Sequence, residues 1–405
     1  MNRQDQQTRD PGSSIESRRR GRRKGPMLIT GIGVIALLVI GYAGVGWYVS
    51  GEIIDDGLLV SQYVVEYDTA VLAVGDDEIT LRVPDDPSTE PDRDAVMGLR
   101  WADGYGQVGP ATSTDGDVET RPFRHLRGNL PAIGEDTVDF DNFAYPNDPS
   151  VLGVDYETGS YATPLGDVEA WLFPGSADTW IVAVHGNAAD RTEYLRLVAS
   201  IHDLGYPILV ARYRNDPESP RTDDSLILMG QEEHVDVASA VDYALSRGAS
   251  DVVVYGTSMG GALALGYALE ESRDVIRGLV LEAPVADLRE VIRLRSGDAL
   301  PIGGPIGDSI LAVGRWFVAL RTGLDFDTVD YVERAAELDV PILLFHGTDD
   351  PKVPIEISQN LSAARPELVE FHPVENGAHI RAWNEDPGGY AETITTFLDR
   401  IGSER

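Results

Sequence analysis

A serine flanked by glycines is the residue of this sequence with the most direct chemical use. The stretch VVVYGTSMGGALAL, residues 252–265, runs from an apolar strand into a helix of small residues and carries Ser258 in the pattern G-x-S-x-G. At a sharp strand-to-helix turn the serine hydroxyl is exposed and can attack a carbonyl carbon. Gly256 and Gly260 let the strand and the helix approach closely, because neither has a Cβ atom. The pattern is short, so the rest of the sequence must supply the partners of a nucleophilic serine.

A nucleophilic serine needs a base, and His379 is the candidate among the 7 His of the chain. It lies in PVENGAHIRAW, in a loop after the last predicted strand. This position makes it the group expected to take the serine proton. The other histidines lie in the N-terminal extension, on predicted helices or on predicted strands, where we expect structural roles: His125, His185, His202, His234, His346 and His372.

An acid completes such a triad, and Asp350 is the candidate. It lies in LLFHGTDDPKVP, between a strand that ends at Phe345 and the turn at Pro351. A carboxylate at this point can hold the imidazole tautomer and stabilise the imidazolium. The neighbouring Asp349 is expected to be a turn residue. Glu282, at the end of the strand in LVLEAP, is the alternative acid.

The backbone amides of Asn187 and Met259 are the candidate donors of an oxyanion hole. In IVAVHGNAAD, His185 and Gly186 end a predicted strand, and Asn187 follows them. Met259 follows the serine at the start of a helix, where N–H groups and the helix dipole favour negative charge. Together the two N–H groups can bind the oxyanion of a tetrahedral intermediate.

Alternating strands and helices from about residue 151 onward would position these groups. TWIVAVHG, YPILVARYR, DVVVYG, RGLVLEAP and VPILLFHG are short apolar runs, typical of strands buried on both faces of a parallel sheet. GQEEHVDVASAVDYALSRG and GGYAETITTFLDRIG are predicted helices. This alternation predicts an α/β fold with helices on both faces of the sheet. A helical lid is predicted over about 285–339, with a longer crossover as the alternative.

The motifs follow one another in the order found in α/β hydrolases, and residues 151–401 resemble that superfamily. Serine, acid and histidine also occur along the chain in the order of this superfamily. The chain is most similar to the serine-esterase branch with monoacylglycerol-lipase-like, acyl-thioesterase-like and serine-aminopeptidase-like members. The resemblance implies an eight-stranded, mostly parallel sheet and no cofactor. The motifs that carry it are HGN at 185–187, GTSMGG at 256–261, HGTDDPKVP at 346–354 and GAH at 377–379.

The first 50 residues predict a membrane anchor. The basic run RRRGRRK, residues 18–24, precedes a stretch without any charge, residues 27–50. A helix of this length can cross a hydrocarbon core of about 30 Å at roughly 1.5 Å per residue. Basic residues before it and acidic residues after it orient the N-terminus toward the cytoplasm. A cleaved signal peptide is the alternative, although such peptides have a shorter apolar region and a small-residue cleavage site.

Composition excludes several kinds of site and partner. The chain of 405 residues has no Cys, which excludes disulfides, thiolate metal sites and a cysteine nucleophile. Its net charge of −34 repels polyanions, so we expect no nucleic-acid partner. No H-E-x-x-H pattern and no complete calcium loop are present, and we predict no metal.

Four segments are predicted: a cytoplasmic basic tail over 1–26, a transmembrane signal-anchor helix over 27–50, an extracytoplasmic β-rich extension or spacer over 51–150, and the α/β hydrolase domain over 151–405. Within the third segment a hairpin is predicted around Gly75. The stretches PDDPSTEPDRD and GQVGPATSTDGD are predicted loops.

The sequence therefore predicts a serine hydrolase of the carboxylesterase, lipase or thioesterase kind. It would be a single-pass protein of the cell membrane with its catalytic domain outside the cytoplasm. Ser258 would attack the ester or thioester carbonyl of a small or lipid-like acyl substrate, with His379 as base and water releasing the acyl group. A serine peptidase acting on short peptides is one alternative, and a non-catalytic surface binding module is another.

Overall fold

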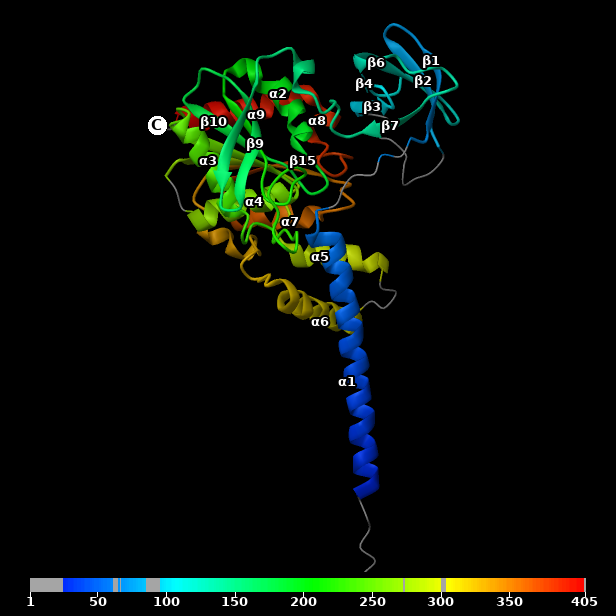
Figure 1. Cartoon of the computed structure of the whole chain (residues 1–405), viewed down its shortest axis with the longest axis vertical. Helices are drawn as coiled ribbons and strands as arrows, with labels where there is room; N and C mark the ends of the chain where they lie inside the picture. Colours follow the sequence, from blue (N-terminus) through cyan, green and yellow to red (C-terminus); the bar gives the residue numbers. More distant parts are fainter. Residues whose placement is uncertain are drawn as a thin grey trace, which may run out of the picture.

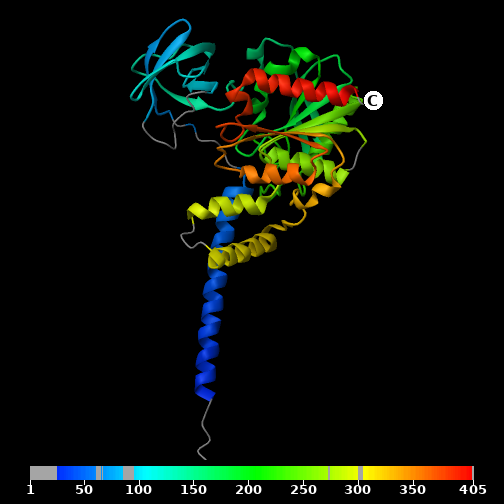
Figure 2. The same cartoon turned by 180° about the vertical axis from the view of Figure 1, so that it is seen from behind.

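The structure is a computed structural model that describes residues 25–60, 65, 67–84, 95–271, 274–299 and 304–403. These residues form a long N-terminal helix, a small β-barrel and an α/β domain (Figures 1 and 2). The predicted basic run at residues 18–24 and nearly all of the loop predicted in PDDPSTEPDRD lie outside the described residues.

The N-terminal helix α1 runs from Gly25 to Ile53 and continues as a short π-helix, η1, Ile54–Leu58. It is thus slightly longer than the apolar run of the sequence. Within the described residues, one helical stretch, Ala36–Leu58, is long and apolar enough to cross a membrane. Its side chains are largely exposed, as for Val39 at 61%.

A closed barrel of antiparallel strands follows α1. The strand order is β2-β1-β7-β3-β4-β6-β5, and a further pairing of β2 with β6 closes the ring. Alternate strand residues, such as Ile79 and Leu81 of β2, fill its interior. The bounds are β1 Thr69–Val74, β2 Glu78–Arg82, β3 Met97–Trp101, β4 Gly104–Val108, β5 Ser113–Asp115, β6 Val118–Gly128 and β7 Thr137–Asp141.

The barrel confirms one local prediction and contradicts another. The hairpin around Gly75 is present, because β1 and β2 pair antiparallel on either side of it. The loop predicted in GQVGPATSTDGD is wrong, because β4 and β5 occupy part of it. Within β4, Gly106 makes room for the Phe123 ring, because a Cβ atom at this position would lie 2.3 Å from that ring.

The α/β domain is built on an eight-stranded sheet with the order β15-β14-β13-β12-β10-β11-β9-β8. The pairings from β11 to β15 are parallel, and β9 and β8 add an antiparallel edge. Every residue of the central β12 is buried, as expected for a strand covered on both faces. The bounds are β8 Glu157–Thr163, β9 Gly166–Phe173, β10 Thr179–Val184, β11 Ile208–Ala211, β12 Asp251–Thr257, β13 Ile276–Glu282, β14 Ile342–Gly347 and β15 Val369–Val374.

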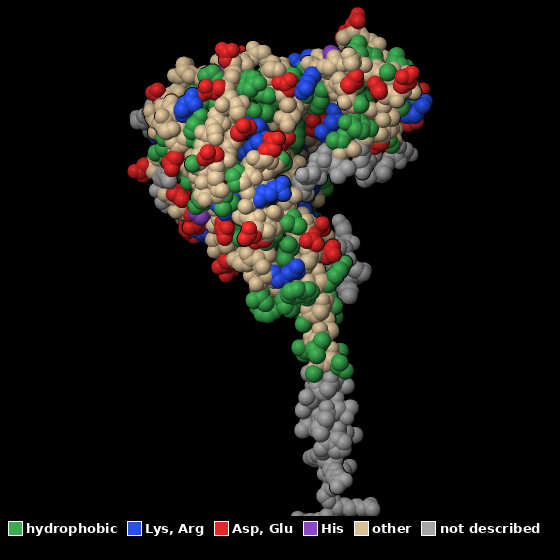
Figure 3. All heavy atoms as spheres, in the orientation of Figure 1, with side chains coloured by type: hydrophobic (Ala, Val, Ile, Leu, Met, Phe, Trp, Pro, Cys, Tyr) green, Lys and Arg blue, Asp and Glu red, His purple; other side chains and the backbone are tan. Residues whose placement is uncertain are grey.

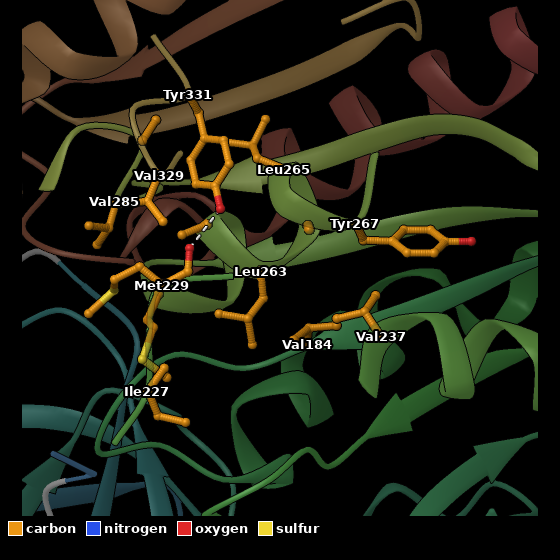
Figure 4. Packing of buried hydrophobic residues seen from close by; sticks show 14 of the residues in the cluster. Val184, Ile227, Met229, Val237, Leu263, Leu265, Tyr267, Val285, Val329 and Tyr331 are labelled. Atoms are coloured by element: carbon orange, nitrogen blue, oxygen red, sulfur yellow. Dashed lines mark hydrogen bonds between the residues drawn. The ribbon is translucent and has the colours of Figure 1, made fainter. Parts of the chain in front are cut away.

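Helices cover both faces of this sheet, as predicted, and alternate strand residues feed two separate cores. Val182 and Val184 of β10 belong to one core, and Ile181 and Ala183 to the other. Figure 4 shows the first core around α4, where the Tyr331 hydroxyl donates to the carbonyl of Met229 at 2.7 Å. The α-helices are α2 Leu195–Ile201, α3 His234–Ser246, α4 Met259–Glu271, α5 Leu288–Ala299, α6 Gly304–Thr322, α7 Ile355–Ala364, α8 Ala382–Glu385 and α9 Pro387–Ser403. Short 3-10 helices are η2 Pro149–Leu152, η3 Arg191–Tyr194, η4 His202–Leu204 and η5 Glu333–Glu337.

The barrel lies against the α/β domain, and Figure 1 shows it at the opposite end of the molecule from the start of α1. Asn384 of α8 makes the principal link. Its side-chain Nδ2 donates to the backbone carbonyls of Val96 at 2.6 Å and Asn142 at 2.8 Å. Its backbone carbonyl accepts from the Val96 N–H at 2.8 Å. The barrel therefore packs beside the α/β domain.

Candidate active site

Ser258 lies at the turn between β12 and α4 in a strained backbone conformation. Its φ is +52°, in the left-handed region that residues with a Cβ atom rarely adopt. The flanking glycines make the turn possible: a Cβ atom on Gly256 would lie 2.3 Å from the Gly260 carbonyl oxygen, and one on Gly260 would lie 2.0 Å from that of Val184. The turn holds the serine side chain clear of both elements.

The structure brings Ser258, His379 and Asp350 into one hydrogen-bonded chain. His379 Nε2 lies 2.9 Å from Ser258 Oγ, and His379 Nδ1 lies 2.7 Å from Asp350 Oδ2. The Asp350 side chain is fully buried, whereas that of His379 is 11% exposed. Because Asp350 accepts from Nδ1–H, Nε2 is left to accept the serine proton.

The Asp350 carboxylate is held in its ionised form. Its Oδ1 accepts from the backbone N–H groups of Lys352 at 2.8 Å and Val353 at 3.0 Å. Burial opposes the charge, but hydrogen bonds with His346 and His379 outweigh it and hold the pKa of Asp350 well below its usual range. His346 Nε2 also lies 3.0 Å from the Val353 carbonyl, so this histidine fixes the loop that carries the acid.

The two other candidate acids lie elsewhere. Asp349 is exposed, and its backbone N–H donates to the Gly377 carbonyl at 3.0 Å. Glu282 is buried and accepts from the Ala382 N–H at 2.8 Å and the Tyr255 hydroxyl at 3.2 Å. Burial raises the pKa of Glu282. The Glu282 carboxylate therefore supports the loop after His379 instead of contacting the imidazole.

Arg196 is a supporting residue that the sequence reasoning missed. Its Nη1 donates to the carbonyl of Ile380 at 3.0 Å and to Asn384 Oδ1 at 2.8 Å. Ile380 directly follows His379 and has a φ of +53°, a strained value for a β-branched residue. A signal was present in the sequence, since an arginine inside the apolar run YLRLVASI has to find partners when buried.

The loop with the sequence HGN passes directly beside the serine. A Cβ atom on Gly186 would lie 3.1 Å from Ser258 Cβ. Asn187 Oδ1 accepts from the Ala188 N–H at 2.8 Å, and Asn187 Nδ2 donates to the Leu59 carbonyl at 3.2 Å. These contacts fix the loop that carries the Asn187 amide. The Met259 amide, the other predicted oxyanion donor, begins α4 immediately after Ser258.

A buried ion pair anchors the same loop from behind. His185 Nε2 lies 2.8 Å from Asp216 Oδ2, and both side chains are almost fully buried. Burial alone would lower the pKa of His185, but the Asp216 charge and hydrogen bond outweigh it and raise the pKa to about 9. His185 therefore carries a positive charge at neutral pH and acts as a structural group.

Ser258 and His379 open into a cavity of about 1340 Å³. The α/β domain provides one wall, and barrel residues such as Met97 and Tyr105 provide another. Asp56, at the end of the N-terminal helix, also lines it. Typical small-molecule sites measure about 300–1,000 Å³, so this cavity is large enough for an acyl compound beyond a short ester. Basic side chains also line it: Arg100, Arg127, Arg295, Lys352 and Arg381.

The predicted lid segment is helical, but its longer helix does not line this cavity. From residues 285–339, as far as they are described, Arg295 of α5 borders the cavity, while α6 packs against α1. Arg295 Nη1 donates to the Asp56 carbonyl at 3.0 Å, which joins α5 to the end of the N-terminal helix. In the described residues, no group of three or more His, Asp or Glu side chains could hold a metal ion.

The chain is similar to several known proteins in sequence or in fold. The uncharacterized protein YfhR of Escherichia coli O157:H7 is 24% identical over 273 residues, which cover 64% of this chain and 86% of that protein. The uncharacterized protein Rv2307c of Mycobacterium tuberculosis is 26% identical over 215 residues, covering 52% and 66%. The structure of the Pyrococcus furiosus esterase Pf2001 covers 63% of this chain and 96% of its own, with a TM-score of 0.51 and 18% identity, and so shares the fold. Residues 181–393, more than half of the chain, match the model of the alpha/beta hydrolase family, and the chain belongs to that family.

Proposed function

We propose that this protein is a membrane-anchored serine hydrolase that cleaves ester or thioester bonds of acyl compounds. The observation that carries the proposal is the hydrogen-bonded chain Asp350–His379–Ser258, with distances of 2.7 and 2.9 Å, at the edge of a large cavity. A strained serine, an imidazole oriented by its hydrogen bonds and a buried carboxylate form the arrangement that acyl transfer needs.

The residues have separate roles in the proposed mechanism. Ser258 Oγ attacks the carbonyl carbon while His379 Nε2 accepts its proton, and Asp350 stabilises the resulting imidazolium. The N–H groups of Asn187 and Met259 bind the oxyanion of the tetrahedral intermediate. His379 then protonates the leaving alcohol or thiol. Water, activated by His379, attacks the acyl-enzyme and releases a carboxylic acid and free Ser258.

The same proposal places α1 in the cell membrane as a single span. The stretch Ala36–Leu58 is long and apolar enough to cross a bilayer. The basic run at residues 18–24 precedes the uncharged residues 27–50, and the acidic Glu52, Asp55 and Asp56 follow them, which favours a cytoplasmic N-terminus. The barrel and the α/β domain then lie outside the cytoplasm.

The Pyrococcus furiosus protein that shares the fold is described as an esterase, which is in keeping with ester cleavage here.

Covalent labelling of the detergent-solubilised full chain tests the activity. We expect a fluorophosphonate probe to label the wild type. The labelling rate of Ser258→Ala and of His379→Gln should be at least 100-fold lower than that of the wild type. Ser246→Ala, at an exposed serine of α3, is the matched control and should label normally. A panel of an activated ester, an acyl thioester and a short peptide amide then identifies the bond class.

The results separate the competing functions. Labelling with ester or thioester turnover supports the proposal. Labelling with turnover of the peptide alone would replace the proposal by a serine peptidase. A folded wild type that does not label at neutral pH would leave a non-catalytic binding module as the better description.

A further inference from the structure

Helices α1 and α6 cross in close contact at two glycines. A Cβ atom on Gly46 of α1 would lie 2.4 Å from Val313 Cγ1, and one on Gly314 of α6 would lie 2.8 Å from Val49 Cγ1. The backbones therefore approach more closely than larger residues would allow. Figures 1 and 2 both show α6 running across α1 at the edge of the α/β domain.

Aromatic and polar side chains secure the crossing on the domain side. The rings of Trp47 and Phe317 meet edge to face with centroids 5.4 Å apart. The Arg321 guanidinium lies 4.6 Å from the Trp47 ring centroid and donates to Ser50 Oγ at 2.7 Å. Nearer the N-terminal end of α1, the Tyr42 hydroxyl donates to Ser309 Oγ. The two helices are thus joined by contacts along both sides of the crossing.

The face of α6 that points away from the protein is apolar. Trp316 is 60% exposed, Leu320 66% and Ile306 63%. Ala312 lies on the same face as Trp316, because residues four apart are neighbours on a helix. The exposed Asp308, four residues before Ala312, lies at the edge of this face. Hydrophobic side chains gather at the lower edge of the body, where it meets α1 (Figure 3).

The position of the crossing indicates what covers this face. It lies between Tyr42 and Ser50, at the end of the uncharged run of α1. If α1 spans the bilayer, a helix that crosses it there lies in the membrane plane at the outer interface. Amphipathic helices bind in this plane with the apolar face among the acyl chains, and Trp, Tyr and Arg gather at this depth.

We infer that the face formed by Ile306, Ala312, Trp316 and Leu320 is a lipid-binding surface that inserts into the outer leaflet. This inference rests on the proposed membrane anchor but not on the proposed hydrolysis. Insertion would fix the orientation of the whole α/β domain, because α1 is also joined to it beyond the crossing. The Ile227 N–H donates to the Leu58 carbonyl at 2.8 Å, close to the cavity.

The absence of cysteine from the chain allows a direct test with single labels. Four full-length variants each receive one cysteine: Trp316→Cys, Leu320→Cys, Val39→Cys and Leu204→Cys. Each is labelled with the environment-sensitive dye NBD and reconstituted into phosphatidylcholine vesicles. The acyl chains of the lipid either carry bromine atoms or do not. Val39 of α1 is the control for the anchor. Leu204, an exposed leucine at 41% beyond α2, is the matched control for a water-facing apolar residue.

We expect brominated lipid to quench the label at least twofold at positions 316, 320 and 39, and by less than 10% at position 204. Quenching at 39 together with values at 316 and 320 like those at 204 would overturn the inference and leave the anchor intact. A blue-shifted label at 316 without quenching by the lipid would mean that a second copy of the chain covers the face, which also overturns it. Lack of quenching at 39 would reject both the anchor and the lipid-binding surface.

Circular dichroism and thermal melting of each labelled variant establish that it is folded. Because the four side chains are exposed, their replacement should leave the melting temperature within about 2 °C of the wild type. Ester hydrolysis plays no part in the readout, so failure of the proposed activity would leave this result unaffected.

Discussion

Three residues at the candidate site have a strained backbone conformation. Ser258, Ala188 and Ile380 all have φ values between +50° and +60°, and each belongs to, or directly follows, a proposed site residue. Strained conformations persist only where neighbours hold them. The Ile380 carbonyl is held by Arg196, and the Ala188 N–H by the side chain of Asn187. These contacts make the site preorganised before any substrate binds.

Replacing Asp350 tests the role of the acid. Loss of the orienting carboxylate of a Ser-His-Asp triad costs about 10⁴ in turnover, because the imidazole adopts the wrong tautomer. We expect this loss for Asp350→Asn, assayed on one activated ester. Asp349→Asn, at the exposed neighbour, is the matched control and should stay within about threefold of the wild type. Glu282→Gln should keep most of the turnover, and a severe loss there with an active Asp350→Asn would move the acid to the earlier strand.

The buried pair His185–Asp216 predicts a specific pH dependence of stability. The pKa of His185 is about 9 in the folded protein, against an ordinary value near 6.5, because Asp216 stabilises the charged ring despite burial. A raised folded pKa adds stability that is complete below the unfolded pKa and lost as pH rises through the folded one. The free energy of unfolding should therefore fall by on the order of 3 kcal/mol between about pH 6.5 and 9. The melting temperature should fall over the same range.

Asp216→Asn provides the comparison for this pair. Without the carboxylate the buried imidazole stays neutral throughout the same pH range. The melting temperature of the variant should therefore lack the decrease that deprotonation of His185 causes in the wild type. Melting of both proteins in one detergent at pH 6.5, 8 and 9.5 gives the difference. Equal slopes for the wild type and the variant would contradict a charged His185.

At the scale of elements, the parts that local patterns determine could be predicted. β12, α4 and α9 follow from unbroken apolar runs and helical periodicity, and the order of the loops that bear Ser258, Asp350 and His379 follows from the strands before them. The barrel could not be foreseen as a closed ring, because the pairing of β2 with β6 is a contact between distant segments. For the same reason the sequence predicted the segment of α6 as part of a lid, although α6 packs against α1.

The turn between β12 and α4 predicts unequal effects of alanine at two glycines. Gly260→Ala would place a Cβ atom 2.0 Å from the Val184 carbonyl oxygen, so the backbone must shift. We expect a loss of about 3 kcal/mol or more and a fall in melting temperature of roughly 6–12 °C. Gly402→Ala in α9, where no atom lies within 4 Å, is the control and should be neutral or slightly stabilising. Equal melting temperatures for the two variants would show that the turn is not tight.

At the scale of the whole molecule, the cavity belongs to three parts of the chain. The α/β domain supplies Ser258 and His379, the barrel supplies residues such as Tyr105, and the end of the N-terminal helix supplies Asp56. Asn384 of α8, four residues after the strained Ile380, joins the barrel to the α/β domain. The size and lining of the cavity are therefore set by how these parts pack, and not by the loops that bear Ser258 and His379 alone.

The proposed topology predicts that everything after α1 faces the outside of the cell. Because the chain lacks cysteine, single cysteines report the side of the membrane without background. Ser403→Cys, at the exposed end of α9, should react with a membrane-impermeant maleimide in intact cells, whereas Gln7→Cys in the N-terminal tail should react only after lysis. The physical reason is the basic run at residues 18–24, which is retained on the cytoplasmic side. Detergent lysis, which exposes both positions, is the control for reactivity. The reverse labelling pattern would contradict the orientation, and a soluble product beginning near Gly51 would show that residues 27–50 act as a cleaved signal peptide.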